Sequence, residues 1–104
     1  MALVSFITKI KAKPGKGAAL EALNREMCTV SEGEPGTLVY CMSRSSEDVE
    51  EFWYFDVYAD QAAFELHCAT PTYKKMIAEI GDYADEMEAT RLEPFVAKGL
   101  DTQR

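Results

Sequence analysis

The chain contains a single histidine, His67, in the segment AAFELHCATPTYKKM (62–76). It follows Phe64 by about one helical turn and precedes a Thr70-Pro71 break. Imidazole is the side chain that ordinarily changes charge near neutral pH, so His67 is the candidate general base or proton-orienting group. The alternative is structural: a helix residue hydrogen-bonded to a sheet or to a partner.

Several large side chains around His67 in the sequence could bind a flat ring. An aromatic or thioether wall buries such a ring, and a tyrosine hydroxyl can donate a hydrogen bond to its oxygen. Trp53 and Phe55 equally suit a hydrophobic core, as do the helically spaced Tyr73 and Met76. The predicted walls are Trp53, Phe55, Phe64, Tyr73 and Met76, and the predicted hydroxyl donor is Tyr40 or Tyr58.

Composition and charge limit the classes of partner. The chain has 104 residues, 47% of them hydrophobic, and a formal net charge of −7 from 11 basic and 18 acidic side chains. A nucleic-acid or anionic-membrane partner needs clustered Lys and Arg, which this balance disfavours. The first residues resemble no signal peptide, and no stretch approaches the ~20 apolar residues of a membrane helix. We therefore expect a cytoplasmic protein.

The three cysteines, Cys28, Cys41 and Cys68, are isolated in the sequence. Without CxxC spacing or a histidine cluster they predict neither a zinc site nor a disulfide framework. The chain also has no GxGxxG motif. We expect no metal and no cofactor.

Hydrophobic periodicity predicts the elements that must position His67. Alternation indicates strands at 3–12, 37–44 and 52–58, and helical spacing indicates helices at 18–32 and 61–69. Thr70 and Pro71 restart a helix whose apolar spacing continues to Met87, and a last strand is predicted at 89–97. The order βαββαβ predicts an α+β, ferredoxin-like plait with a four-stranded antiparallel sheet and both helical regions on one face.

The third strand is apolar on both faces. Trp53, Phe55 and Val57 alternate with Phe52, Tyr54, Asp56 and Tyr58. An uncovered antiparallel face is usually polar, so this pattern predicts a partner, most simply a second copy packed sheet to sheet. Asp56 is expected to form an ion pair at that interface, with Arg44 as a candidate partner.

Together these segments resemble the antibiotic biosynthesis monooxygenase family. The resemblance covers residues 4–97 of a single domain spanning 1–104, and rests on KPGKGAALEAL, EGEPGTLVYCMSR, FWYFDVYADQAAFELHCATPTYKKM and RLEPF. It implies a homodimeric α+β barrel with a pocket between the sheet and the helices of each subunit.

The family's activities are mixed, so fold resemblance does not settle the reaction. Haem-degrading members carry an asparagine, a tryptophan and a histidine close to positions occupied here by Thr8, His67 and Ile77, which disfavours that activity. A helix histidine followed by Thr-Pro is similar to the quinol-oxygenase branch, a cofactor-independent monooxygenase of quinols or other phenols.

Two alternatives stay open at this point. One is an isomerase of a phosphorylated sugar-like molecule, with Lys74 or Lys75 near the phosphate. The other is a non-enzymatic binding module, favoured if no cavity exists beside His67. We expect a planar aromatic substrate to need at least ~300 Å³ of concave space.

Overall fold

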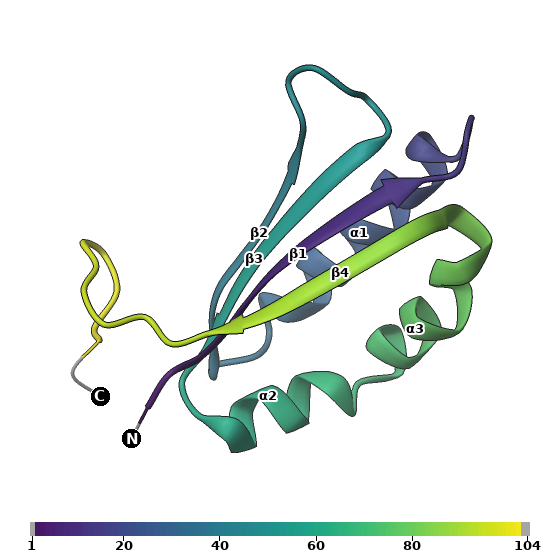
Figure 1. Cartoon of the computed structure of the whole chain (residues 1–104). Helices are drawn as coiled ribbons and strands as arrows, with labels where there is room; N and C mark the ends of the chain where they lie inside the picture. Colours follow the sequence, from purple (N-terminus) through teal and green to yellow (C-terminus); the bar gives the residue numbers. More distant parts are fainter. Residues whose placement is uncertain (1, 103–104) are drawn as a thin grey trace.

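The computed structural model describes residues 2–102, and in this range the chain forms one four-stranded antiparallel sheet and three helices (Figure 1). The elements in chain order are β1 (Val4–Ala12), α1 (Gly17–Ser31), β2 (Thr37–Arg44), β3 (Glu51–Tyr58), α2 (Gln61–Cys68), α3 (Pro71–Tyr83) and β4 (Ala84–Leu92). The strands lie in the spatial order β2-β3-β1-β4. The predicted α+β, ferredoxin-like fold is therefore confirmed.

Alternation along β3 decides which side chains face the helices, which all lie on one face of the sheet (Figure 1). Phe52, Tyr54 and Tyr58 are buried on this face, and the Tyr54 hydroxyl donates to Asn24 Oδ1 of α1 at 2.5 Å. Trp53, between Phe52 and Tyr54, points to the opposite face because successive side chains of a strand alternate.

The two helices after β3 begin where their capping residues predict. The Asp60 carboxylate accepts a hydrogen bond from the Ala63 backbone N–H at 2.8 Å and starts α2. The Thr70 hydroxyl accepts from the Tyr73 N–H at 3.2 Å, and Pro71 occupies the first turn of α3. Local side-chain chemistry thus divides the region into two helices immediately after His67.

The C-terminal strand lies earlier than predicted. We expected helical spacing to continue through Ala84 to Met87 and a strand at 89–97, but α3 ends at Tyr83 and β4 spans Ala84–Leu92. Pairing with β1, from Ala12↔Ala84 to Ser5↔Leu92, overrides the local helical pattern. The ladder stops before Pro94, which has no N–H to donate.

The face of the sheet opposite the helices carries exposed apolar side chains. Ile7, Trp53, Phe55 and Leu92 are 37%, 39%, 38% and 40% exposed. Such a group exceeds the isolated apolar residues that are normal on a protein surface. None of the helices in the described range is long and apolar enough to cross a bilayer.

Candidate functional site

His67 is buried and held by a carboxylate. Its side chain is 2% exposed, and Nδ1 lies 2.7 Å from Glu34 Oε1. The same Glu34 oxygen accepts a hydrogen bond from the Thr37 hydroxyl at 2.8 Å. In the tautomer that donates Nδ1–H to Glu34, Nε2 carries a lone pair. The carboxylate thereby fixes the orientation of the ring and leaves Nε2 as the nitrogen available to a ligand.

The turn before β2 brings Glu34 to α2. The Thr37 N–H donates to the Glu34 carbonyl at 3.0 Å, and the Ala59 N–H donates to the Gly36 carbonyl at 2.9 Å. A Cβ on Gly36 would lie 2.5 Å from Ala63 Cβ, closer than carbon atoms approach. Gly36 therefore allows α2 to pack directly on the turn, which is what places His67 within reach of Glu34.

Three tyrosine rings surround the imidazole. The ring centroids of Tyr40, Tyr58 and Tyr73 lie 5.1, 5.2 and 5.3 Å from that of His67. Burial is the main reason that the pKa values of all three are raised, that of Tyr73 to about 12. Their hydroxyls therefore remain protonated at neutral pH, and that of Tyr58 donates a hydrogen bond to Asp56.

Asp56 is a second carboxylate close to His67. It lies on the helix-facing side of β3, and the Tyr58 hydroxyl donates to its Oδ2 at 2.6 Å. Burial raises the pKa of Asp56, while the Tyr58 hydrogen bond and the electrostatic effect of the nearby His67 oppose the shift. The expected ion pair with Arg44 is absent, because Arg44 pairs with Glu21 instead. Asp56 thus belongs to the His67 group and not to the open face.

A cavity of about 160 Å³ lies beside His67, between the sheet and helices α2 and α3. Its polar lining is Thr8, Asp56 and His67 together with tyrosine side chains. Its aromatic lining is Phe6, Tyr40, Tyr54, Phe64 and Tyr73, and its remaining walls come from apolar side chains such as Ile10, Met42, Met76, Ile77, Ile80 and Met87. It is smaller than the ~300 Å³ we expected, although a cavity of ~150 Å³ can hold benzene.

The structure brings together some of the predicted site residues and separates others. Tyr40, Phe64, His67, Tyr73 and Met76 line the cavity. Tyr58 is completely buried behind them, where it contacts His67 and gives its hydroxyl to Asp56.

Trp53 and Phe55 do not join this group. They project from the opposite face of β3, because alternation places them out of phase with Tyr54 and Asp56. The prediction that Trp53 and Phe55 form walls of this pocket is therefore wrong.

Sequence reasoning missed two members of the site, Glu34 and Asp56. Glu34 lies 33 residues from His67, in the turn between α1 and β2. A signal for Asp56 was present in the sequence: it alternates with Tyr54 and Tyr58, which places the three side chains on one face of the strand.

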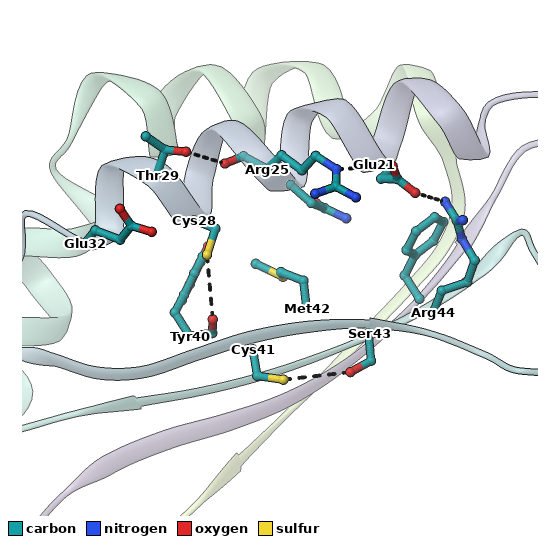
Figure 2. Close-up of a pocket in the computed structure, with 12 residues that line it drawn as sticks. Glu21, Arg25, Cys28, Thr29, Glu32, Tyr40, Cys41, Met42, Ser43 and Arg44 are labelled. Carbon is teal, nitrogen blue, oxygen red and sulfur yellow. Dashed lines mark hydrogen bonds and ion pairs between the residues drawn. The ribbon is translucent and has the colours of Figure 1, made fainter.

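A larger, open groove of about 670 Å³ runs between α1 and the edge strand β2 (Figure 2). Tyr40 and Met42 line both this groove and the cavity, so they form the wall between them. Its two arginines are engaged, since Arg25 Nε lies 3.2 Å from Glu21 Oε2 and Arg44 pairs with the other oxygen of the same carboxylate. The groove offers no group comparable to the buried His67–Glu34 pair.

The residues of the site do not form a metal centre. Within residues 2–102, no group of three or more His, Cys, Asp or Glu side chains is placed to hold a metal ion. The three cysteines are free thiols, and burial raises the pKa of Cys68.

Comparison with known proteins assigns the family. The model of the antibiotic biosynthesis monooxygenase (ABM) family matches residues 3–79, and the chain belongs to this family. An uncharacterized Synechocystis protein, sll1783, is 29% identical over 73 residues, which is 70% of this chain. The aligned region covers 50% of that relative, so the chain spans about half the length of the curated protein it matches.

Solved structures share the fold over nearly the whole chain. A candidate antibiotic biosynthesis monooxygenase from Bacteroides thetaiotaomicron is 27% identical with a TM-score of 0.86, covering 98% of this chain and 97% of that one. Rv0793 from Mycobacterium tuberculosis is 25% identical with a TM-score of 0.85, covering 95% and 100%. PA3566 from Pseudomonas aeruginosa, 24% identical with a TM-score of 0.85 and covering 92% and 97%, shows likeness of fold alone.

Proposed function

We propose that the protein is a cofactor-independent monooxygenase of a quinol or another phenol, with His67 as proton acceptor. The observation that carries this proposal is the buried His67–Glu34 pair, 2.7 Å apart, at the wall of an aromatic-lined cavity. A carboxylate-oriented imidazole in a largely apolar pocket is suited to general-base chemistry.

Deprotonation is the step that the protein would assist. Nε2 of His67 accepts a phenolic proton, and Glu34 stabilises the resulting imidazolium through Nδ1–H. The phenolate transfers one electron to O₂, and the radical pair combines to form a C–O bond. Loss of water from the hydroperoxide then gives the product. Overall, one quinol and one O₂ yield one hydroxyquinone and one water, and each product receives one of the two oxygen atoms of O₂.

The polar groups of the cavity favour a phenol over a phosphorylated sugar. None of the described residues that line the cavity is Lys or Arg, and a phosphate there would face the carboxylate of Asp56. Lys75, which we considered for phosphate, forms an exposed ion pair with Glu26 at 3.2 Å, and Lys74 is exposed on α3. The isomerase alternative would therefore need its phosphate outside the cavity. The non-enzymatic binding module was favoured if no cavity existed beside His67, and the cavity that lies there removes that argument for it.

Oxygen uptake with a panel of hydroquinones tests the proposal. Purified metal-free wild type is compared with His67→Gln and His67→Ala, and autoxidation is subtracted. We expect uptake to fall about 10²–10⁴-fold in both variants, the usual contribution of a general base. Under ¹⁸O₂ the product should gain one labelled oxygen atom. Leu66→Ala, at a position 72% exposed on the same helix, is the matched control and should keep wild-type uptake.

Two results would contradict this assignment. Uptake no greater than autoxidation across the panel would remove the oxygenase activity for those substrates. Equal uptake by wild type and both His67 variants would keep an oxygenase but remove His67 from its mechanism. Circular dichroism of each variant separates loss of the fold from loss of the base.

We also propose that a second copy of the chain covers the open face of the sheet. Ile7, Trp53, Phe55 and Leu92 supply an apolar surface there, and a two-fold arrangement would bury the same residues of both copies. The cavity lies on the other side of the sheet, so the two faces would serve separate purposes.

A further inference from the structure

The most exposed residues that line the cavity beside His67 lie together on one side of it. Of its lining residues only Ile77, Met87 and Ala89 are exposed, Ile77 by 45% and Met87 by 53%. Ile77 lies on α3, and the other two lie on β4, the edge strand into which α3 leads directly (Figure 1). This side, which we call the mouth of the cavity, is thus bounded by α3 and β4, and all of its exposed side chains are apolar.

The His67 imidazole and the Asp56 carboxyl group of the lining lie away from these exposed residues, whereas the half-buried Thr8 pairs with Ala89. His67 is 2% exposed, and Asp56 is tied to the completely buried Tyr58. A ligand that offers a hydroxyl to these groups must therefore enter with its polar end first. The portion that enters last remains between Ile77 and Met87, which can contact it only through apolar atoms.

The volume limits what can enter. A cavity of about 160 Å³ matches the ~150 Å³ that is known to hold benzene in another protein. A second fused ring adds about two-thirds more ring carbon, which a close-packed site of this size does not accommodate. One ring therefore fits inside, and any larger substituent must pass through the mouth.

We infer that the substrate is a single-ring phenol or quinol carrying an apolar substituent, which leaves the cavity between Ile77 and Met87. This rests on the proposed function in one respect, since it uses the same cavity and the same hydroxyl contact to His67. It goes further by fixing the ring count, the direction of binding and the chemical character of the substituent.

Calorimetry with 4-alkylphenols under nitrogen, where no oxidation occurs, tests the inference. The series runs from phenol to 4-hexylphenol, with 2-naphthol as the fused-ring probe. We expect the dissociation constant to fall about two- to fourfold for each added methylene, the upper value applying to a fully buried group. 2-Naphthol should bind at least tenfold more weakly than 4-butylphenol, which has the same number of carbon atoms.

Variants at the mouth test whether the gain in affinity per methylene arises from contacts with Ile77 and Met87. Ile77→Glu and Met87→Glu lie on different elements, and each should abolish most of the gain per methylene. Leu66→Glu places the same charge at an exposed apolar position of α2 outside the cavity and should retain the wild-type gain. Circular dichroism identifies a variant that fails to fold, and the other mouth variant then provides the test.

The outcomes separate the two proposals. If phenol binds but affinity does not change with chain length, or if 2-naphthol binds as tightly as 4-butylphenol, the substrate class is overturned while the phenol site stands. A gain per methylene that survives in both mouth variants also overturns it. If neither phenol nor any alkylphenol binds, both this inference and the proposed function are overturned.

Discussion

Replacing Glu34 with alanine should lower the free energy of unfolding by about 2–3 kcal/mol. Glu34 Oε1 accepts from His67 Nδ1 at 2.7 Å and from the Thr37 hydroxyl at 2.8 Å. The bond to the buried imidazole accounts for most of this effect, since hydrogen bonds to charged groups contribute ~1.5–3 kcal/mol and His67 cannot regain a water partner. The Thr37 hydroxyl is half-buried and can bind water instead.

Glu34→Gln is the matched variant, because its amide oxygen can accept both bonds. Its NH₂ group would take the place of Oε2, which is buried without a partner in the native protein. We therefore expect Glu34→Gln to lower the free energy of unfolding by less than ~1 kcal/mol, compared with about 2–3 kcal/mol for Glu34→Ala. For Glu34→Ala this corresponds to a fall in melting temperature of roughly 10–20 °C. Because Glu34 is only a positioning residue, Glu34→Gln should still lower oxygen uptake about 10–100-fold with little loss of stability.

Urea denaturation measures these costs, followed by far-ultraviolet circular dichroism and by the fluorescence of Trp53, the single tryptophan. All variants are compared at one protein concentration, since self-association would add to stability. In a His67→Phe background, Glu34→Ala should cost at least ~1 kcal/mol less than in the wild type. A coupling near zero, or a Glu34→Gln cost equal to that of Glu34→Ala, would refute the assignment of Glu34 as the partner of His67.

Three further predictions concern other parts of the molecule. Burial raises the pKa of Asp56, so between its ordinary and raised pKa the native state binds more protons than the unfolded state, and stability falls as the pH rises through that window. Asp56→Asn should therefore raise the unfolding free energy at pH 7 and flatten its acid-side pH dependence, as measured by denaturation at several pH values; an unchanged pH profile would contradict the shift. Tyr54→Phe should lower the free energy of unfolding by about 1–3 kcal/mol, because it leaves Asn24 Oδ1 without its partner. Adding Asn24→Leu should recover most of that loss, as measured by thermal unfolding, since Asn24 Nδ2 is already without a partner. Phe55→Glu should convert the proposed dimer to a monomer in sedimentation experiments, whereas Val49→Glu, at an exposed loop position, should not; a wild-type monomer would reject the dimer.

Much of the fold could be predicted because its signals are local. Alternation identified β1, β2 and β3, and the side chains of Asp60 and Thr70 marked the starts of α2 and α3. The C-terminal strand was misplaced because its local sequence is compatible with a helix, and only pairing with β1 makes it a strand.

The candidate site could be predicted only in part. His67 was identifiable from its residue type, since it is the only histidine. Its neighbours were not, because Glu34 is 33 residues away, Asp56 lies on the preceding strand, and no local pattern records which carboxylate will meet an imidazole. Trp53 and Phe55 were wrongly grouped with the pocket walls for a different reason. Alternation placed them on one face of β3, but both faces are apolar, so the sequence could not say which face the helices cover.

By itself, the sequence determined the order of the elements, the resemblance to the family, the helix break after His67 and the presence of two apolar sheet faces. These depend on interactions between residues close in the chain or on simple periodicity. Only the tertiary structure decided that the helices cover the Tyr54 face, that Gly36 admits α2 closely enough for Glu34 to hold His67, and that a cavity of about 160 Å³ lies beside His67. Burial, cavity volume and long-range hydrogen bonds arise from packing between distant segments, which a linear pattern does not encode.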